Sequence, residues 1–587
     1  MSEASIEQLV QDWLRLDRDP ASRKLVEDLW RAGDSKTLER YMRPRLEFGT
    51  AGLRGPMRAG WAGLNDLMVV QTCQGMGRYA ANVIDNALTR GVVIGHDHRH
   101  NSRRWAEMAA ESFSKQGYQV FLLRGLSFTP LVPFGVTHLR AAIGCMITAS
   151  HNPGEDNGIK LYWENAVQII SPHDEGIAAA ILQSLEPASW ELLPTTPLVD
   201  HTSRVHDAYF TGVLPELMRP LGTSRTPLRI VHTSLHGVAE PFMRRAFALL
   251  GDSVEVFSVP QQSKPDPDFP TTPFPNPEEK GTLDLAISYA DQLGVSCVYA
   301  NDPDADRFSV AEKVGSEWKI LTGNEVGVLL AATILHWHKE ERRDISKVYM
   351  ITTVVSSKML QFMAEEEGFS YAECLTGFKN IGNLAGELEQ AGHTVLFSYE
   401  EALGYAVSTH IKDKDGISTA LVFAQLMLKA QQGFSLRAQL DALYAKYGYF
   451  VSSNGSVRCE SASIQHIFAQ LRYSGPEEQA VVYNDQALRY PEQLAGLAVT
   501  RIIDRTLGYD SAQATAASQL GTQAGQMVQF HASTRQFQIF LTIRASGTEP
   551  KVKYYLEGKS AVENKSDLDA LVKSVAHEIV SKWLLVV

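Results

Sequence analysis

The sequence predicts an α/β fold divided into several domains. Short apolar runs alternate with segments of helical periodicity, the pattern of β-α-β units around buried sheets. This pattern occurs three times before residue 448, and a different, β-rich alternation follows. The length of 587 residues exceeds what one hydrophobic core supports, since domains usually span about 100–200 residues. We therefore expect three α/β domains and one α+β domain.

In the first α/β unit, a predicted strand ends at Ser150. Strands are predicted at 91–97, 118–123 and 141–150, with a helix from Ser102 onward. Ser150 thus lies just past the carboxyl end of a strand, where ligands collect in open α/β sheets. The second unit has predicted strands at 228–237 and 254–259, a helix at 239–251 and a further strand end within 297–307. Its proline-rich segment 263–281 is predicted to be a surface loop.

The third unit and the last domain complete the predicted plan. The third unit has strands at 347–355 and 394–400 and helices at 358–368 and 415–433. Beyond residue 448, the elements are helices at 461–475 and 567–585 and strands at 535–547 and 552–559. The predicted domains are 1–205, 206–330, 331–448 and 449–587.

Composition excludes several classes of partner. Fifty-five Lys plus Arg against 67 Asp plus Glu give a net charge of −12, which argues against nucleic acid and anionic membranes. The five cysteines are scattered without a C-x-x-C pair, so neither a disulfide framework nor a structural zinc site is expected. The acidic N-terminal segment has no signal-peptide pattern and no long apolar run follows. We expect a cytoplasmic protein.

The motif "DPDADR" predicts a divalent-metal site. Asp302, Asp304 and Asp306 repel one another, and a hard cation bound by oxygen is the natural compensation. A solvated acidic loop is the plain alternative. An EF-hand is excluded because Arg307 and Lys313 stand where glycine and glutamate are required. An aspartyl-phosphate nucleophile is disfavoured by the third aspartate, and a magnesium ion held by three carboxylates still has room for a phosphate oxygen.

Several other loops offer groups for anions or polar substrates. "RASGTEP" (544–550) combines a guanidinium, two hydroxyls and a glycine turn, although a plain turn would have the same sequence. Arg54 in "FGTAGLRG", Lys379 in "TGFKNIG" and Glu400 in "YEEALGY" are weaker candidates, because isolated surface charges look identical. In "HDHRH" (96–100), zinc binding is disfavoured since Asp97 and Arg99 intervene, and Ser102 fits the N-cap of the next helix.

The stretch "TASHNPGEDNGIK" (148–160) leaves three interpretations of Ser150 open. A hydrolase nucleophile needs a base and an acid in space, and no G-x-S-x-G elbow is present. Helix capping is the plain interpretation. Neither accounts for a triple-aspartate loop and anion-binding loops elsewhere in the chain, which favour a phosphoryl carrier.

Taken together, five motifs in order resemble the α-D-phosphohexomutase superfamily: "GTAGLRG", "TASHNP", "DPDADR", "EEALG" and "RASGTEP". "HTSLHGVAEPF", "PDPDFPTTPFPNPEE" and "TGFKNIGN" are similar to its phosphopentomutase branch, which also handles glucose phosphates. The resemblance implies four domains around a central cleft, the last like the TATA-binding protein. It also implies a phosphoryl group on Ser150 and Mg²⁺ held there with the three aspartates.

The resemblance assigns further roles and a reaction. Arg544, Ser546, Gly547 and Thr548 would bind the substrate phosphate. Glu400 would bind the sugar, and Lys379 would contact the phosphate or the sugar. Arg54, Arg307, His151 and Lys160 would complete the catalytic set, with Lys160 preferred over His151 for proton transfer. Ala402 stands where hexose-preferring relatives have serine.

The implied function is a phosphopentomutase acting on ribose or deoxyribose 1-phosphate, with phosphoglucomutase activity besides. A sugar bisphosphate, glucose 1,6-bisphosphate or ribose 1,5-bisphosphate, would be intermediate and activator. The alternatives are a phosphoglucomutase or glucose 1,6-bisphosphate synthase, and a non-catalytic sugar-phosphate sensor. Sugar phosphates are the expected partners, and the sequence predicts no oligomeric state.

Overall fold

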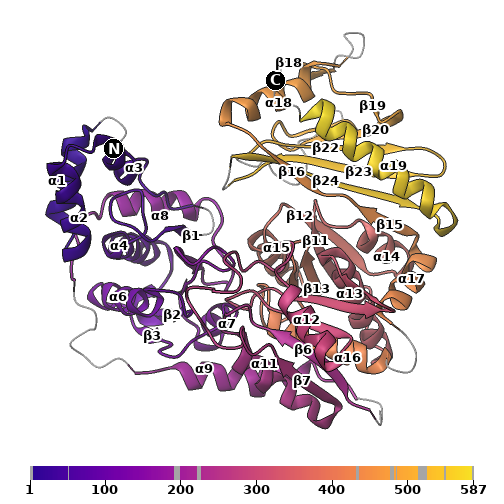
Figure 1. The fold of residues 1–587 in the computed structure, drawn as a ribbon, viewed down its shortest axis with the longest axis horizontal. Coiled ribbons are helices and arrows are strands. Elements are labelled where there is room, and N and C mark those ends of the chain that lie inside the picture. Colours follow the sequence, from indigo (N-terminus) through magenta and orange to yellow (C-terminus); the bar gives the residue numbers. More distant parts are fainter. Residues whose placement is uncertain are drawn as a thin grey trace. The chain divides into compact units, whose positions relative to one another are not determined.

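The computed structural model describes residues 4–49, 52–190, 199–220, 226–430, 435–475, 481–483, 486–512, 525–547 and 550–584 (Figure 1). The chain divides into two units. The first comprises Met1–Ile351 and Gly377–Ser435, and the second comprises Thr352–Thr376 and Leu436–Val587.

The first sheet of the first unit is mixed, with strand order β1-β5-β4-β2-β3. Its strands are β1 (Gly52–Pro56), β2 (Val92–His96), β3 (Val120–Leu122), β4 (Ile143–Ile147) and β5 (Asp156–Tyr162). β2 pairs in parallel with β3 and β4, whereas β5 pairs antiparallel with β4 and β1. Every residue of β2 and β4 is buried, as expected for apolar strands covered on both faces. The helices α6 (Ser102–Lys115) and α7 (Leu131–Leu139) pack on either side of these strands (Figure 1).

The second sheet repeats this plan, with strand order β10-β9-β8-β6-β7. Its strands are β6 (Leu228–Thr233), β7 (Val254–Ser258), β8 (Cys297–Ala300), β9 (Ser309–Val314) and β10 (Glu317–Ile320). β6 is parallel to β7 and β8, and β9 is antiparallel to β8 and β10. β8 therefore occupies the position that β4 has in the first sheet, and β9 that of β5.

This shared plan places the predicted functional loops at equivalent positions. The Ser150 loop connects β4 to the antiparallel β5, and the triple-aspartate loop connects β8 to the antiparallel β9. In the third sheet, β13 (Thr394–Glu400) ends at Glu400 and turns directly into the antiparallel β14 (Gly404–Ala406). Each loop follows the same kind of strand end, so one topological rule positions all three.

The helices of the first unit cover these sheets and include an N-terminal group. They are α1 (Ile6–Leu16), α2 (Pro20–Arg31), α3 (Ser35–Met42), α4 (Asp66–Val83), α5 (Ala87–Arg90), α8 (His173–Leu182), α9 (Thr202–Ala208), α10 (Leu214–Glu216), α11 (Ala239–Phe247), α12 (Asp284–Leu293), α13 (Gly323–Glu340), α15 (Phe378–Gln390) and α16 (Gly416–Ala430). Ser5 caps α1 by accepting the N–H of Gln8 at 3.1 Å. Trp13 of α1 packs edge-on against Trp61, with ring centroids 5.1 Å apart. The amphipathic N-terminal segment is thus part of the folded core.

The second unit is built on a largely antiparallel β-sheet, as predicted for a separate C-terminal domain. The strands of that sheet are β15 (Tyr449–Ser452), β16 (Gly455–Arg458), β19 (Gln493–Leu494), β20 (Leu497–Asp504), β21 (Tyr509–Asp510), β22 (Met527–Ser533), β23 (Gln538–Ala545) and β24 (Lys551–Ser560). β17 (Val481–Tyr483) and β18 (Gln486–Leu488) form a separate two-stranded sheet, and the residues of this unit also include β12 (Ser370–Cys374). β23 lies between β22 and β24 and pairs antiparallel with both. Its helices are α14 (Met359–Glu367), α17 (Leu436–Tyr447), α18 (Ser461–Tyr473) and α19 (Lys565–Glu578).

The predicted multidomain α/β class is confirmed, together with most of the elements within it. The third unit's first strand is β11 (Val348–Thr353), and no helix or strand lies between 263 and 281. The prediction that Ser102 is the N-cap of α6 was wrong. Asn101, in the left-handed region at φ 65°, is the residue before α6, and Ser102 is the first helical residue, with its hydroxyl donating to Asp97. The domain boundaries stay predictions.

Candidate active site

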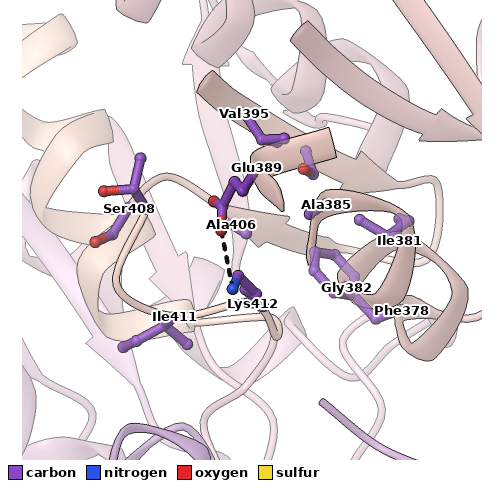
Figure 2. A pocket seen from close by; sticks show the side chains of 12 residues that line it. Phe378, Ile381, Gly382, Ala385, Glu389, Val395, Ala406, Ser408, Ile411 and Lys412 are labelled. Carbon is purple, nitrogen blue, oxygen red and sulfur yellow. Dashed lines mark ion pairs between the residues drawn. The ribbon is translucent and has the colours of Figure 1, made fainter. Parts of the chain in front are cut away.

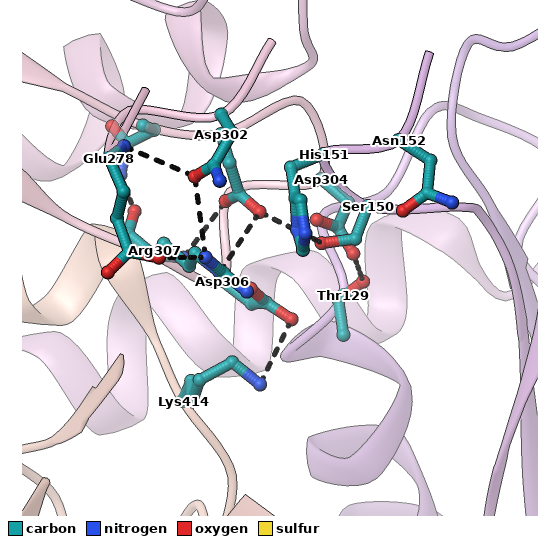
Figure 3. Close-up of polar contacts among 12 residues, drawn as sticks. Thr129, Ser150, His151, Asn152, Glu278, Asp302, Asp304, Asp306, Arg307 and Lys414 are labelled. Atoms are coloured by element: carbon teal, nitrogen blue, oxygen red, sulfur yellow. Dashed lines mark hydrogen bonds and ion pairs between the residues drawn. The ribbon is translucent and has the colours of Figure 1, made fainter. Parts of the chain in front are cut away.

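Ser150 lies in a constrained and buried turn. Its φ of 53° falls in the left-handed region, which is unfavourable for a residue with a side chain. The Ser150 N–H donates to Thr148 Oγ1 at 2.9 Å, and its own Oγ donates to Asp302 Oδ2 at 3.0 Å. Asp302 belongs to the other sheet's loop, so the fold brings two motifs 152 residues apart into contact (Figure 3).

Asp302, Asp304 and Asp306 form one buried cluster. One carboxylate oxygen of each lies within 4.8 Å of the others, and none of the three residues is more than 1% exposed. Thr129 holds Asp304 from the first sheet's side, because its Oγ1 donates to Asp304 Oδ2 at 2.5 Å and its N–H donates to the Asp304 carbonyl at 2.9 Å. The predicted site is therefore an enclosed group of oxygens, and the exposed acidic loop is excluded.

Burial and neighbouring charges shift the pKa values of these carboxyls. Burial, together with the carboxylates of Asp306 and Asp304, raises the pKa of Asp302 well above its ordinary value. Burial acts in the same direction on Asp304, but the ammonium of Lys160 and the hydroxyl of Thr129 outweigh it and lower that pKa. The two carboxyls respond oppositely because only one of them has a lysine beside it.

The cluster fits a hard divalent cation. Asp304 Oδ1 and Asp306 Oδ1 are buried and have no hydrogen-bond partner among the residues that the structure describes. Unpartnered buried carboxylate oxygens are costly unless something else coordinates them. Oxygen ligands of this kind suit Mg²⁺ or Mn²⁺ and not the softer metals that prefer cysteine or histidine.

Three cations surround the carboxylates. Lys160 Nζ, from β5, lies 2.7 Å from both Asp304 Oδ2 and Asp306 Oδ2. Lys414 Nζ lies 3.4 Å from Asp306 Oδ2, and the Arg307 guanidinium Nε lies 3.9 Å from Asp302 Oδ2. The backbone N–H of Arg307 also donates to Asp302 Oδ1 at 3.0 Å. Burial disfavours the Lys160 ammonium, but the two carboxylates outweigh it and raise the pKa of Lys160. A base at this position requires a lowered pKa, so the arrangement seen here keeps Lys160 charged.

His151 also contacts the Ser150 hydroxyl. Its Nδ1 lies 3.2 Å from Ser150 Oγ (Figure 3). Burial, and then the charges of Arg307 and Arg54, lower the pKa of His151 well below its ordinary value. Its ring is neutral at pH 7, and one nitrogen can accept a proton. Arg54 itself is exposed on β1 and donates to Asn152 Oδ1 at 3.1 Å.

The sugar-binding candidate Glu400 lies at the end of β13, and its loop contacts the metal loop. The Phe308 N–H donates to the Leu403 carbonyl at 3.1 Å, and Arg307 forms an isolated antiparallel β-bridge with Gly404. Burial raises the pKa of Glu400 to about 7, against the opposing charge of Lys414. Glu400 therefore titrates near neutrality.

Lys379 lies in the first turn of α15, where burial lowers its pKa. The same helix lines a cavity of about 10 Å³, whose lining includes the ion pair between Lys412 Nζ and Glu389 Oε2 at 2.9 Å (Figure 2). A volume of that size holds about one water. The cavity is too small to be the sugar site.

The predicted phosphate-binding residues belong to the second unit. Arg544, near the end of β23, donates from one guanidinium nitrogen to Thr376 Oγ1 at 2.6 Å, and its Nε is buried with no partner within the described ranges. The Ser546 N–H donates to the Lys551 carbonyl at 2.9 Å and closes the turn. An added Cβ at Gly547 would meet nothing within 4 Å. Thr548 lies outside the described residues.

Sequence reasoning missed Thr129, Lys414 and Arg99. Thr129 and Lys414 contact the carboxylates, but each lies more than 100 residues from them in the chain and in no recognised motif. Arg99 was noticed only within "HDHRH". The three histidines there do not meet: His96 bonds backbone carbonyls, His98 packs against Phe269 and His100 pairs with Asp268.

Gly237 sets the position of the metal loop and yields a testable prediction. A Cβ at residue 237 would lie 2.3 Å from Pro303 Cα and 2.5 Å from its carbonyl oxygen, both backbone atoms between Asp302 and Asp304. We expect Gly237→Ala to lower the free energy of unfolding by about 1–3 kcal/mol, measured by denaturant titration. Gly212→Ala is the control, since its Cβ meets nothing within 4 Å. Equal stability of the two variants would contradict this packing.

Three domain families match the chain in order. They are described as phosphoglucomutase/phosphomannomutase, alpha/beta/alpha domain I at residues 45–187, domain II at 207–315 and domain III at 322–447. The first match contains the Ser150 loop, the second the aspartate loop and the third the Glu400 loop.

Relatives of similar length match over almost the whole chain. The phosphopentomutase of Mus musculus is 41% identical, covering 98% of this chain and 94% of that protein. The glucose 1,6-bisphosphate synthase of Homo sapiens is 38% identical with the same coverage of both chains. The solved structure of a putative phosphomannomutase from Thermus thermophilus superposes with a TM-score of 0.64 at 20% identity, covering 92% of this chain and all of that one, and so shares the fold.

Among the residues described, no helix is both long enough and apolar enough to cross a membrane.

Proposed function

This chain belongs to the phosphoglucomutase/phosphomannomutase family and is an enzyme of the phosphomutase class, and from that premise we propose that it is a phosphopentomutase. It interconverts the 1-phosphate and 5-phosphate of ribose or deoxyribose through a phosphoserine and a sugar bisphosphate. Phosphoglucomutase activity is a second capacity of the same site. The relationship inferred from the five sequence motifs is confirmed.

The observation that carries the proposal is the contact between Ser150 and the aspartate cluster. The Ser150 hydroxyl lies 3.0 Å from a buried carboxylate that is itself one of three. In a hydrolase triad the serine instead bonds a histidine that a carboxylate orients. A phosphoryl group on Ser150 Oγ would instead extend toward oxygens and cations already gathered there. Phosphoryl transfer needs this combination of positioning and charge neutralisation.

Asp302, Asp304 and Asp306, together with the phosphate on Ser150, would hold Mg²⁺. When bound, the ion would neutralise charge on the transferring group. The unpartnered Oδ1 atoms of Asp304 and Asp306 are the donors that favour this assignment.

The proposed transfer moves one phosphoryl group between two oxygens. A hydroxyl of the sugar phosphate attacks the phosphorus on Ser150 Oγ, forming an O–P bond at the sugar while the Oγ–P bond breaks. The electron pair stays on Oγ, and the hydroxyl proton passes to a base of the chain. After the bisphosphate turns around, the reverse step restores phosphoserine and releases the isomeric monophosphate.

Two side chains are candidates for the proton. Lys160 is preferred on the family resemblance, and His151 is the one whose ring nitrogen contacts Ser150 Oγ. Loss of rate and a changed pH profile in Lys160→Ala, with His151→Ala less affected, would support Lys160. The opposite ranking would assign the proton to His151.

The substrate phosphate is proposed to bind at Arg544, Ser546, Gly547 and Thr548. The buried, unpartnered Nε of Arg544 supports an anion there, because a guanidinium recognises phosphate with several nitrogens at once. Glu400 would accept hydrogen bonds from sugar hydroxyls, and Lys379 would contact the sugar or its phosphate. Ala402 removes one hydroxyl contact, worth about 1 kcal/mol, and so favours a relaxed sugar preference.

The pKa of Glu400 gives a pH prediction. A carboxyl with a pKa of about 7 is protonated at pH 6 and ionised at pH 8, and only the ionised form accepts hydrogen bonds through both oxygens. The charged groups near it are Lys414, Glu401, Arg307 and Asp306. We expect KM for the sugar phosphate to fall by up to about tenfold between pH 6 and 8.

Glu400→Gln is the matched control for this prediction. The substrate phosphate titrates identically in both enzymes, so the difference between their KM profiles isolates Glu400. Identical profiles would show that Glu400 does not bind the sugar through its charge.

A glucose 1,6-bisphosphate synthase is the second candidate, because a relative of that name is 38% identical over 98% of the chain. The same serine chemistry would serve if the bisphosphate were released and an acyl phosphate rephosphorylated Ser150. Turnover on ribose 1-phosphate, glucose 1-phosphate, and glucose 1-phosphate with a glycolytic acyl phosphate separates the candidates. We expect the highest kcat/KM on ribose 1-phosphate; bisphosphate accumulation with the acyl donor as the fastest reaction would favour the synthase.

A further inference from the structure

Arg99 is a fully buried cation with four backbone partners in the Ser150 loop. Its Nη1 donates to the carbonyls of Pro153 at 2.7 Å and Asp156 at 3.1 Å. Its Nη2 donates to the carbonyls of Ser150 and Asn152, each at 2.6 Å. One side chain thus gathers four of the seven carbonyls between residues 150 and 156. None of these contacts involves the Ser150 hydroxyl.

Asp97 balances the buried charge of Arg99 and also bonds the Arg99 backbone. The Asp97 carboxylate lies 3.5 Å from Arg99 Nε, and both side chains are wholly buried. Its other oxygen accepts the backbone N–H of Arg99 at 2.9 Å and the hydroxyl of Ser102 at 2.6 Å. Arg99 Nε and Asp97 Oδ2 form an ion pair with no hydrogen bond to either atom among the described residues. The two bonds that the other Asp97 oxygen accepts from Arg99 N–H and Ser102 therefore hold the carboxylate opposite the guanidinium.

The proline-rich segment 263–281 packs against Arg99 through Phe269. Phe269 is fully buried, and the Arg99 guanidinium carbon lies 4.9 Å from its ring centroid. The segment also touches the Ser150 loop itself, since a Cβ at Gly154 would lie 2.8 Å from the Pro267 carbonyl oxygen. His100 Nε2 adds a contact to Asp268 Oδ1 at 2.7 Å. The segment 263–281 therefore contacts both Arg99 and the Ser150 loop that Arg99 bonds.

We propose that Arg99 is a positioning residue that fixes the Ser150 loop for phosphoryl transfer, with Phe269 holding its guanidinium in place. Ser150 adopts an unfavourable positive φ, and its Oγ must meet the aspartate cluster of another domain. Four hydrogen bonds to the carbonyls around it define that conformation. This role rests on the proposed function of Ser150 and extends it to a residue that touches neither substrate nor metal.

The geometry requires arginine in particular. A guanidinium is planar with donors in a fixed fork, whereas a lysine ammonium is a single point that cannot reach four carbonyls spread along a turn. Arg99→Lys keeps the charge opposite Asp97 and removes the fork. Since a misplacement of about 1 Å at a reacting group lowers rates by about 100-fold, we expect kcat to fall about 100-fold. KM for the sugar phosphate should stay near its wild-type value, because the Arg99 side chain is wholly buried and its nitrogens bond carbonyls of the loop.

Two measurements on purified full-length protein test this. The first is the rate at which glucose 1,6-bisphosphate phosphorylates Ser150, followed by intact mass, alongside kcat and KM. The second is amide hydrogen exchange of the peptide covering 148–158, which we expect to be faster in Arg99→Lys while the rest of the sheet is unchanged. Arg103→Lys is the matched control, since Arg103 is the exposed arginine one turn along, paired with Glu107 on its own helix.

Phe269→Leu provides a second route if Arg99→Lys does not fold. It preserves every charge and hydrogen-bond donor, and we expect a smaller fall in kcat with unchanged KM and faster exchange in 148–158. Wild-type kcat in the folded variants, or unchanged exchange in that peptide, would overturn the proposal. If wild-type Ser150 takes no phosphate, the proposed function fails, and the exchange experiment still decides whether Arg99 positions the loop.

Discussion

Ser150→Ala is expected to abolish mutase activity, lowering kcat by more than about 10⁴-fold, as removing a covalent nucleophile does in other enzymes. The hydroxyl is the only atom in the proposed cycle that carries the phosphoryl group between the two half-reactions. Its removal costs one hydrogen bond to Asp302, worth about 1 kcal/mol, so the variant should remain folded. The assay is conversion of ribose 1-phosphate with saturating sugar bisphosphate and Mg²⁺.

Ser171→Ala is the matched control for that variant. Ser171 is exposed, and its hydroxyl donates to Glu175, away from the aspartate loop. It should keep wild-type kcat and KM. Residual activity of Ser150→Ala above about a hundredth of wild type would mean that the phosphoryl group travels by another residue.

Asp304→Asn is expected to remove the response to Mg²⁺, with activity falling by at least about 100-fold. The substitution preserves shape but removes the charge of a carboxylate that is fully buried and whose Oδ1 has no protein partner among the described residues. Wild-type protein with Mg²⁺ at about 100 times Kd should gain about 2.7 kcal/mol in unfolding free energy, seen as a higher Tm. The variant should gain almost nothing.

Asp291→Asn serves as the control for this charge change. Asp291 is half exposed on α12 and pairs with Lys313, so losing it should leave both the Mg²⁺ dependence and the rate unchanged. An Mg²⁺-induced rise in Tm of the same size in Asp304→Asn would place the metal elsewhere.

Much of the fold could be predicted because local patterns determine it. The apolar runs that became β2, β4, β6 and β8 are buried on both faces, and such strands are recognisable without knowing their neighbours. The start of α6 was harder: Asn101 in a left-handed conformation precedes the helix without capping it, and Ser102 bonds back to Asp97. The Ser102 hydroxyl bonds Asp97 five residues earlier and does not cap the helix, so the capping preference of serine was not realised at this boundary.

In the candidate site, too, the residues of local motifs could be predicted and those joined only by the fold could not. The three aspartates lie within five residues, so their mutual repulsion alone indicated a metal. Thr129 and Lys414 contact the same carboxylates from distant elements, and no local pattern marks them. Lys160 was recognised in its motif, but the raised pKa that Asp304 and Asp306 give it depends on a contact 144 residues away. Electrostatics of this kind requires the folded geometry.

The location of the phosphoryl group tests the central claim most directly. Purified protein is incubated with glucose 1,6-bisphosphate and Mg²⁺, digested, and mapped by mass spectrometry, with Ser150→Ala in parallel. We predict phosphate on the peptide containing Ser150 in the wild type, its loss on addition of ribose 1-phosphate, and none in the variant. Phosphate absent from Ser150 under all these conditions, while ribose 1-phosphate is still converted, would contradict the phosphoserine mechanism.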